Sequence, residues 1–134
     1  MHRGVLEACL PGVITLAVLM LFHGISKVFS GIDVIIGLVQ GIYLPGAVAY
    51  LVFVGEIVAP IFVLVGYWTR AAAFVMAGNM VVAILLAHAG DLFSLAPNGA
   101  YALELQFFYL LCSVTVIALG AGRYSVAGVN GKWN

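Results

Sequence analysis

The sequence has very little charge. Of its 134 residues, 7% are charged and 65% are hydrophobic, and five Lys and Arg balance five Asp and Glu. A soluble domain is typically about half apolar and about a quarter charged, and a globule of this length could not hide so much apolar surface from water. The shortage of charge therefore excludes a soluble enzyme, a disordered tail and a basic module that binds nucleic acid. The lipid bilayer must be the solvent of this chain.

Motifs for metals, nucleotides and covalent catalysis are also missing. The two cysteines, Cys9 and Cys112, lie far apart in the sequence and form no C-x-x-C or Cys/His spacing, so nothing indicates zinc, an iron–sulfur cluster or attached haem. A disulfide between them is not expected, because Cys9 lies at the end of an apolar stretch and Cys112 in the middle of another. No nucleophile–base pair, phosphate loop or dinucleotide fingerprint is present. Polar side chains inside the apolar segments are the remaining candidates for function.

Four apolar stretches are long enough to cross the ~30 Å hydrocarbon core. They must be helical, because a segment in lipid has to satisfy its own backbone polar groups. The predicted fold is an all-α membrane protein, a four-helix bundle that forms a single transmembrane domain over residues 1–134. Its predicted spans are residues 9–29, 45–68, 71–89 and 102–120, with Thr69 and Arg70 as the turn between the second and third. Apolar residues at helical spacing within 32–44 predict a short interfacial helix between the first two spans.

The basic residues are distributed unevenly about these spans. With four spans, four of the five basic residues fall on one side of the membrane: Arg3, Arg70, Arg123 and Lys132. The opposite loops carry Asp33 and Asp91. The positive-inside rule therefore predicts a multi-pass protein with both termini in the cytoplasm.

Glu56 is the most informative residue of the sequence. It lies close to the middle of the second predicted span, where a charged carboxylate costs ~2.5–3.5 kcal/mol on insertion scales. The side chain should therefore face the bundle and be paired or protonated. Pro60 cannot donate to the Glu56 carbonyl, which predicts a kink at this level. A functional carboxyl is favoured over one that only joins helices by hydrogen bonds, although the second reading stays open.

His23 and Lys27 stand four residues apart on the first predicted span, and hence on one face of its helix. Gly24 between them would let a neighbouring helix approach closely. Lys27 is near enough to the end of the span to reach the headgroups. Alternatively, Lys27 or His23 extends inward to Glu56.

Further polar residues lie in the third and fourth predicted spans. Asn79 is near the middle of the third span and His88 at its outer end, and a straight helix would place them on opposite faces. A polar cavity that opens to the outer side of the membrane would collect most of these groups, although scattered polarity at helix ends would look similar. The predicted members of this cavity are His23, Lys27, Glu56, His88, Glu104 and Gln106.

No intrinsic cofactor and no metal site is evident from these residues. His23 and His88 lie at similar depths on different helices, so haem ligation stays open, but no haem-packing pattern surrounds them. Histidines without such a pattern more often titrate or form hydrogen bonds. Haem is therefore disfavoured.

Three segments of the chain resemble the DoxX family of small four-helix membrane proteins. They are LFHGISK at 21–27, GEIVAPIFVLVGYWTRAAA at 55–73 and GAGRYSVAG at 120–128. The last resembles the family's G-x-G-R-x-S signature, and the family's Gly-x-x-Lys, membrane Glu and Thr-Arg turn correspond to Gly24 with Lys27, Glu56, and Thr69 with Arg70. Ala127 departs from the pattern, since relatives often carry an acidic residue near this position.

The resemblance implies a role beside redox complexes in the bacterial plasma (inner) membrane. The family is named for subunits of a thiosulfate:quinone oxidoreductase, which suggests a quinone as ligand and oxidoreductase subunits as partners. In the first hypothesis, Lys27 or His23 donates to a quinone carbonyl, Glu56 accepts or donates a proton, and a partner supplies electrons. Asn79 and Glu104 are the further binding residues predicted. Whether the chain is itself an enzyme is left open, since the family name does not establish catalysis.

Two other functions compete with this one. A non-catalytic scaffold or assembly subunit would dock on partner helices through small residues of the third span: Ala71, Ala72, Ala73, Ala77, Gly78, Ala83 and Ala87. The same small residues also suit internal packing. A small proton-coupled transporter is less favoured, because four helices usually have to form a homo-oligomer to build a path and no duplicated pair of broken helices is visible.

Overall fold

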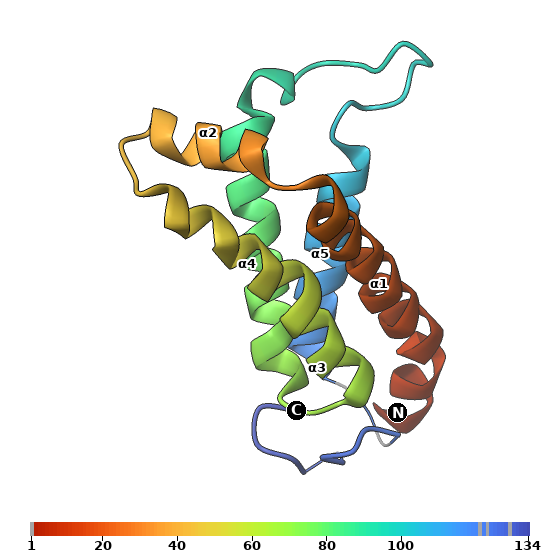
Figure 1. Ribbon diagram of the computed structural model, residues 1–134. Coiled ribbons are helices and arrows are strands. Elements are labelled where there is room, and N and C mark those ends of the chain that lie inside the picture. Colours follow the sequence, from red (N-terminus) through yellow and green to blue (C-terminus); the bar gives the residue numbers. More distant parts are fainter. Residues whose placement is uncertain (1, 121, 123, 129) are drawn as a thin grey trace.

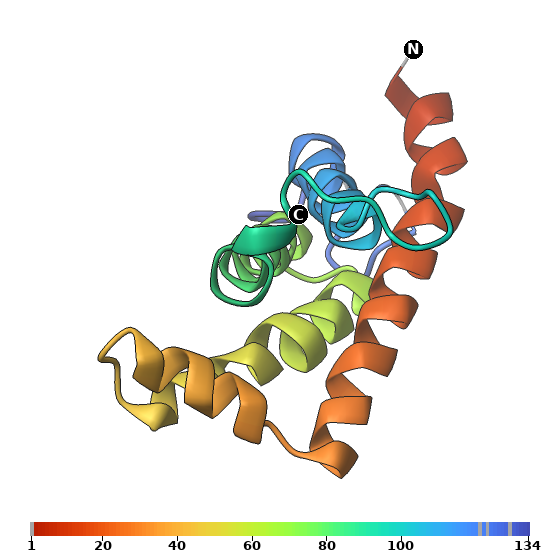
Figure 2. The same cartoon turned by 90° about the horizontal axis from the view of Figure 1, so that it is seen from above.

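The computed structural model describes residues 2–120, 122, 124–128 and 130–134, with side chains from Cys9 onward. Four helical segments run side by side with alternating direction: α1, the segment from η1 to α3, α4, and α5 (Figure 1, Figure 2). The short α2 lies across one end of this bundle, here named the α2 end. Both chain termini lie at the other, the termini end (Figure 1). The bounds are α1 His2–Ser30, α2 Asp33–Gly41, 3-10 helix η1 Gly46–Leu51, π-helix η2 Val54–Val58, α3 Ala59–Val65, α4 Thr69–Ala87, 3-10 helix η3 Ala89–Asp91 and α5 Glu104–Leu119.

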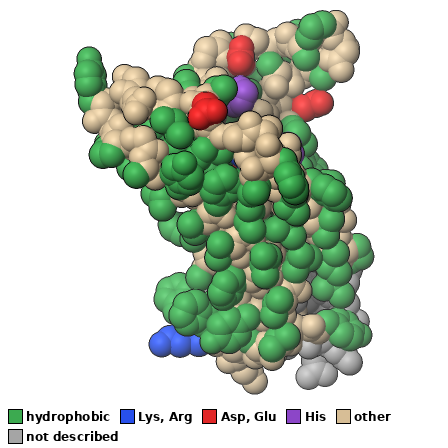
Figure 3. Space-filling model, in the orientation of Figure 1, with side chains coloured by type: hydrophobic (Ala, Val, Ile, Leu, Met, Phe, Trp, Pro, Cys, Tyr) green, Lys and Arg blue, Asp and Glu red, His purple; other side chains and the backbone are tan. Residues whose placement is uncertain are grey.

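Helices of membrane-spanning length dominate the fold. Within the described residues, three are long and apolar enough to cross a bilayer: Cys9–Ser30, Gly46–Val65 and Thr69–Ala87. The apolar α5 has 16 residues, which is about 24 Å of helix. Hydrophobic side chains cover the middle of the face seen in Figure 3, with basic side chains at the termini end and acidic and histidine side chains at the α2 end. The predicted all-helical membrane fold is confirmed.

Two groups of buried apolar side chains hold the helices together. The larger lies between α1, α3, α4 and α5, and its fully buried centre includes Met20, Ala73 and Met76. The smaller joins α2 to η1 through Ile32, Val39 and Ala49. The helix α2 falls within the predicted range 32–44, and its one buried residue, Val39, faces this smaller core.

The turn between α3 and α4 lies earlier than predicted. Gly66 (φ 72°) and Trp68 (φ 50°) are both left-handed, and Thr69 is already the first residue of α4. The predicted turn at Thr69 and Arg70 is therefore wrong. Glycine is the residue that most readily takes the left-handed conformation that ends a helix. α3 therefore ends at Val65, with Gly66 as its C-cap, rather than continuing to Trp68.

The chain that follows α5 folds back onto this turn. Ala127 N donates to the Gly66 carbonyl (3.1 Å), and Arg70 N donates to the Trp133 carbonyl (2.9 Å). Thr69, which is completely buried, donates from Oγ1 to Asn134 Oδ1 (2.7 Å). Thr69 and Arg70 thus hold the C-terminal tail against the bundle instead of forming a turn. Arg123, expected to be an orientation anchor within the family signature, lies outside the described residues, as does the side chain of Arg3.

We expect Thr69→Val to lower the free energy of unfolding by about 1–3 kcal/mol, because it leaves the Asn134 amide oxygen buried without its donor. The tail should also loosen, which faster tryptic cleavage at Lys132 in detergent micelles would report. Thr115→Val is the matched control, since Thr115 is exposed and donates only to Leu111 O of its own helix. Equal cleavage rates in the two variants would contradict this role of Thr69.

Candidate functional site

A buried ion pair joins α1 to the π-helix η2. Glu56 is 2% exposed and lies in the middle of η2. Lys27, in the last turn of α1, reaches it with Nζ at 2.6 Å from Oε1 and 2.7 Å from Oε2. Lys27 was expected either to reach the headgroups or to extend inward to Glu56. In the structure it extends inward, although 30% of its side chain remains exposed. The pair offsets the cost of placing the Glu56 carboxylate deep inside an apolar bundle.

Asn79 adds a third helix to this pair. Its Nδ2 donates to Glu56 Oε1 at 3.3 Å from α4. The carboxylate thus accepts hydrogen bonds from side chains of α1 and α4 while it is carried by η2. Lys27, Glu56 and Asn79 form one polar junction of three helices, here named the Lys–Glu–Asn junction.

Two glycines allow the three helices to come so close. A Cβ atom at Gly24 of α1 would lie 2.5 Å from Ile57 Cγ1 and 2.6 Å from the Glu56 backbone oxygen. A Cβ atom at Gly55 would lie 2.5 Å from Cβ of Asn79 on α4. Neither position can hold a larger residue without moving a neighbour. The close approach expected at Gly24 is therefore present, and Gly55 provides a second one on the other side of η2.

The backbone around Glu56 departs from α-helical geometry. The turn Val54–Val58 is a π-helix, closed by a hydrogen bond from Ala59 N to the Val54 carbonyl. Pro60 follows it and has no N–H to give to the Glu56 carbonyl. The sequence predicted a kink here, and the helix adopts one wide turn at this level. Single π-turns of this kind are frequent at functional sites.

A cavity of about 150 Å³ opens beside the junction. Lys27 and Glu56 form part of its wall, and Met20, Met80, Ala83 and Leu105 supply apolar surface. His23 and Tyr109 also line it, with their rings packed edge to face at 5.6 Å between centroids. Among the described residues, no group of three or more His, Cys, Asp or Glu side chains is placed to hold a metal ion.

Gln106 and His88 complete the wall of the cavity. Gln106 Nε2 lies 3.4 Å from His88 Nε2, and Gln106 Oε1 is buried with no hydrogen-bond partner among the described residues. Turning the amide over would pair its oxygen with His88 and leave its nitrogen alone instead. In either orientation one polar atom of the Gln106 amide is buried without a hydrogen-bond partner among the described residues.

The structure brings together most of the predicted site residues. His23, Lys27 and Glu56 line the cavity, and Asn79 contacts it indirectly through Glu56. His88 also lines the cavity. α4 ends at Ala87 and His88 (φ −130°) lies outside the helix, so the expectation that Asn79 and His88 occupy opposite faces of a straight helix does not apply. Glu104 is exposed and does not line the cavity.

Tyr109 is the polar residue of the cavity that sequence reasoning did not single out. It is 4% exposed and lies three residues after Gln106, hence on the same face of α5. Glu104 is two residues before Gln106 and so lies on a different face. This helical spacing was the signal in the sequence that would have chosen Tyr109 over Glu104.

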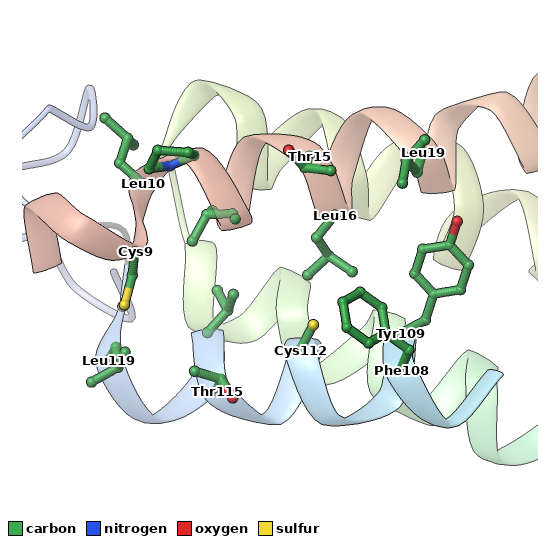
Figure 4. A pocket seen from close by; sticks show the side chains of 15 residues that line it. Cys9, Leu10, Thr15, Leu16, Leu19, Phe108, Tyr109, Cys112, Thr115 and Leu119 are labelled. Atoms are coloured by element: carbon green, nitrogen blue, oxygen red, sulfur yellow. The ribbon is translucent and has the colours of Figure 1, made fainter. Parts of the chain in front are cut away.

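The cysteines lie away from the polar cavity. Both Cys9 and Cys112 are free thiols, as the prediction of no disulfide required. They line a second, apolar cavity between α1 and α5, nearer the termini end (Figure 4).

Comparison with known proteins identifies the family. The DoxX family model matches residues 9–89. The chain belongs to the DoxX family. The matched range includes Lys27, Glu56 and Asn79, whereas Gln106 and Tyr109 lie beyond it. No curated protein and no solved structure matches the chain.

Proposed function

We propose that this DoxX-family protein is a quinone-linked component of a membrane oxidoreductase complex, and that its polar cavity binds the quinone headgroup. The observation that carries the proposal is the convergence of the Lys27–Glu56 pair, two histidines and the Gln106 side chain on one cavity. A quinone headgroup is an apolar ring with carbonyl oxygens that accept hydrogen bonds. Its site therefore needs donors within a largely apolar slot.

The proposal includes an arrangement in the bacterial plasma membrane. α1, the segment from η1 to α3, α4 and α5 are the four spans, with the termini end in the cytoplasm and α2 at the opposite interface. The basic side chains at the termini end support this orientation (Figure 3). α5 falls short of the ~30 Å core by a few ångströms, which local thinning of the bilayer accommodates. The cavity then lies in the outer half of the membrane.

Hydrogen-bond donors for the quinone carbonyls are present on the wall of the cavity. Lys27 carries three N–H groups, and Glu56 takes up two of them. The third is available to a carbonyl oxygen, as are the His23 ring and the Gln106 amide. Because 150 Å³ is below the ~300–1,000 Å³ of pockets that enclose a whole drug-sized ligand, the cavity is sized for a headgroup rather than for a complete quinone.

The same wall offers groups that exchange protons. Reduction of a quinone to a quinol takes up two electrons and two protons, and in this proposal a partner subunit supplies the electrons. Glu56 accepts or donates protons beside the headgroup. His88 Nδ1 lies 3.7 Å from Asp91 Oδ2 at the α2 end. His88 and Asp91 thus connect the cavity to that surface.

The packing of α4 weakens the argument for a scaffold. Three of the seven small residues that suggested a docking helix, Ala72, Ala73 and Ala77, are buried inside the bundle. Gly78 and Ala87 are exposed. Internal packing therefore accounts for three of the seven small residues, and quinone binding is the function that the polar cavity supports better.

We expect Glu56→Gln to weaken binding of tetramethylbenzoquinone to the purified protein by roughly tenfold or more. The substitution removes the charge that holds Lys27 at the cavity and the group that exchanges protons, and charge-assisted hydrogen bonds are worth ~1.5–3 kcal/mol. Titration calorimetry in nanodiscs measures the effect. Visible and mass spectra of gently purified protein would show whether quinone and partner subunits co-purify.

Glu104→Gln is the matched control, since it makes the same chemical change on an exposed residue outside the cavity. Its quinone affinity should equal that of the wild type. Absence of saturable binding to the wild type, or equal affinity in the two variants, would remove Glu56 from a quinone site. A stoichiometric membrane partner that co-purifies equally with both variants would then favour the scaffold.

A further inference from the structure

An apolar groove of about 370 Å³ runs between α1 and α5 (Figure 4). On α5 its wall is formed by Tyr109, Cys112, Val116 and Leu119, which are three or four residues apart and so share one helix face. These residues span about 15 Å of helix. The facing wall of α1 includes Gly12 and Leu16. The groove therefore follows both helices from mid-bundle toward the termini end.

The path of α1 explains why the groove exists. At Gly24 the helix is in close contact with η2. Toward its N-terminal end it diverges from α5 (Figure 1, Figure 2). The divergence begins on the termini side of the contact between Gly24 and η2. The space between α1 and α5 therefore widens away from the polar cavity. Exposed apolar residues such as Ile14 on α1 and Leu111 on α5 face outward near it, so its surroundings are hydrocarbon.

Tyr109 connects this groove to the polar cavity. It lines both. Its ring packs against His23 on the polar side, and Figure 4 shows it at one end of the groove, beside Leu19. Within the described part of the chain, its hydroxyl has no hydrogen-bond partner. The buried side chain of Tyr109 thus lies between the polar cavity, which is sized for a headgroup, and the apolar groove.

The geometry points to an amphiphilic quinone as the ligand. Its headgroup binds in the polar cavity and its hydrocarbon tail binds in the α1–α5 groove. This inference rests on the proposed function and adds to it the ligand's tail, its orientation and its route. The tail runs from Tyr109 toward Cys9 and Leu119, and the ligand enters from the lipid between α1 and α5.

The shared wall is the reason to assign the groove to a quinone tail rather than to a phospholipid chain. A phospholipid would keep its charged headgroup at the membrane surface, outside the groove. Its chain would then fill the groove whether or not the polar cavity is occupied. A quinone tail couples the two spaces, because headgroup and tail belong to one molecule.

Gly12→Leu tests this coupling. Gly12 lines the groove, and a Cβ atom there meets nothing within 4 Å, so a leucine side chain at this position has room to enter and narrow the groove. We expect it to lower the affinity for decylbenzoquinone about tenfold, with concentrations expressed per lipid. The affinity for tailless tetramethylbenzoquinone should change by less than about twofold, because the sites are separate. Gly78→Leu is the control: its Cβ is also unobstructed, on the exposed face of α4.

The native thiols give a second measurement without substitution. Both cysteines of the chain line the groove. Decylbenzoquinone should slow their alkylation by an apolar maleimide, tetramethylbenzoquinone should not, and Glu56→Gln should abolish the protection. Protection by phospholipid that is independent of quinone and of Glu56, or equal affinity of Gly12→Leu and Gly78→Leu for decylbenzoquinone, would overturn the inference. The proposed function would survive that result if tetramethylbenzoquinone still binds in a Glu56-dependent manner, and it fails if neither quinone binds.

Discussion

Lys27→Met is expected to lower the free energy of unfolding by about 3 kcal/mol, which is the lower end of the cost of leaving a buried charge without its partner. Glu56 is 2% exposed, and without Lys27 its carboxylate keeps only the hydrogen bond from Asn79. Methionine retains most of the volume and apolar contacts of lysine. The loss of stability therefore comes from the unpaired charge of Glu56 and not from a cavity left by the shorter side chain.

Glu56→Gln should cost less, about 1 kcal/mol. Glutamine keeps an oxygen that accepts from Asn79, and the unpaired Lys27 is already 30% exposed at the end of α1, so it can turn toward water and headgroups. The two halves of one ion pair are thus expected to differ in their cost, because only one of them can leave the bundle.

Unfolding in mixed micelles of increasing denaturing detergent measures both variants. The double variant Lys27→Met/Glu56→Gln should be more stable than Lys27→Met alone, since it removes the stranded charge. Equal losses for the two single variants would show that Glu56 is neutral in the folded protein, and the ion pair would then not be what holds α1 to η2.

Gly24→Ala is expected to destabilise the bundle by about 2 kcal/mol, within the range known for overpacking. The added Cβ would lie 2.6 Å from the backbone oxygen of Glu56, which cannot turn aside as a side chain can. α1 and η2 must therefore separate. The separation draws Lys27 away from Glu56, so the variant should also bind tetramethylbenzoquinone more weakly.

Gly12→Ala is the comparison for Gly24→Ala. It makes the same substitution on the same helix, where a Cβ atom meets nothing within 4 Å. Alanine favours a helix over glycine by up to ~1 kcal/mol, so no loss of stability is expected. If the two alanine variants unfold at the same detergent fraction, the contact at Gly24 does not govern the position of α1.

The polar site was largely foreseeable, because lipid makes each buried charge conspicuous. Glu56 in mid-span required a partner, and Lys27 with Gly24 on the first span provided a candidate at the right depth. The position of Gln106 at the start of the fourth span also placed it on the outer side. What periodicity could not decide was whether Lys27 faced the headgroups or the bundle, since both positions are open to a long, flexible side chain.

Other features depended on segments distant in sequence. Thr69 and Arg70 lie against the C-terminal tail through contacts with Trp133 and Asn134, which no local pattern connects to them. His88 lines the cavity because α4 ends one residue before it, and helix ends are set by packing and by loop conformation as much as by composition.

By itself, the sequence determined that this chain is a helical membrane protein with an acid near mid-span, because apolar length and the cost of unsatisfied backbone in lipid favour spanning helices. Its resemblance to the DoxX family rested on three motif-bearing segments. The tertiary structure alone decided which side chains meet: that Lys27 and Asn79 both reach Glu56, and that His88 lines the cavity beyond the end of α4. The physical reason is that these contacts depend on the tilt of α1 and on the close approaches at Gly24 and Gly55. Such distances between helices are set by side-chain packing across the bundle, which no single helix encodes.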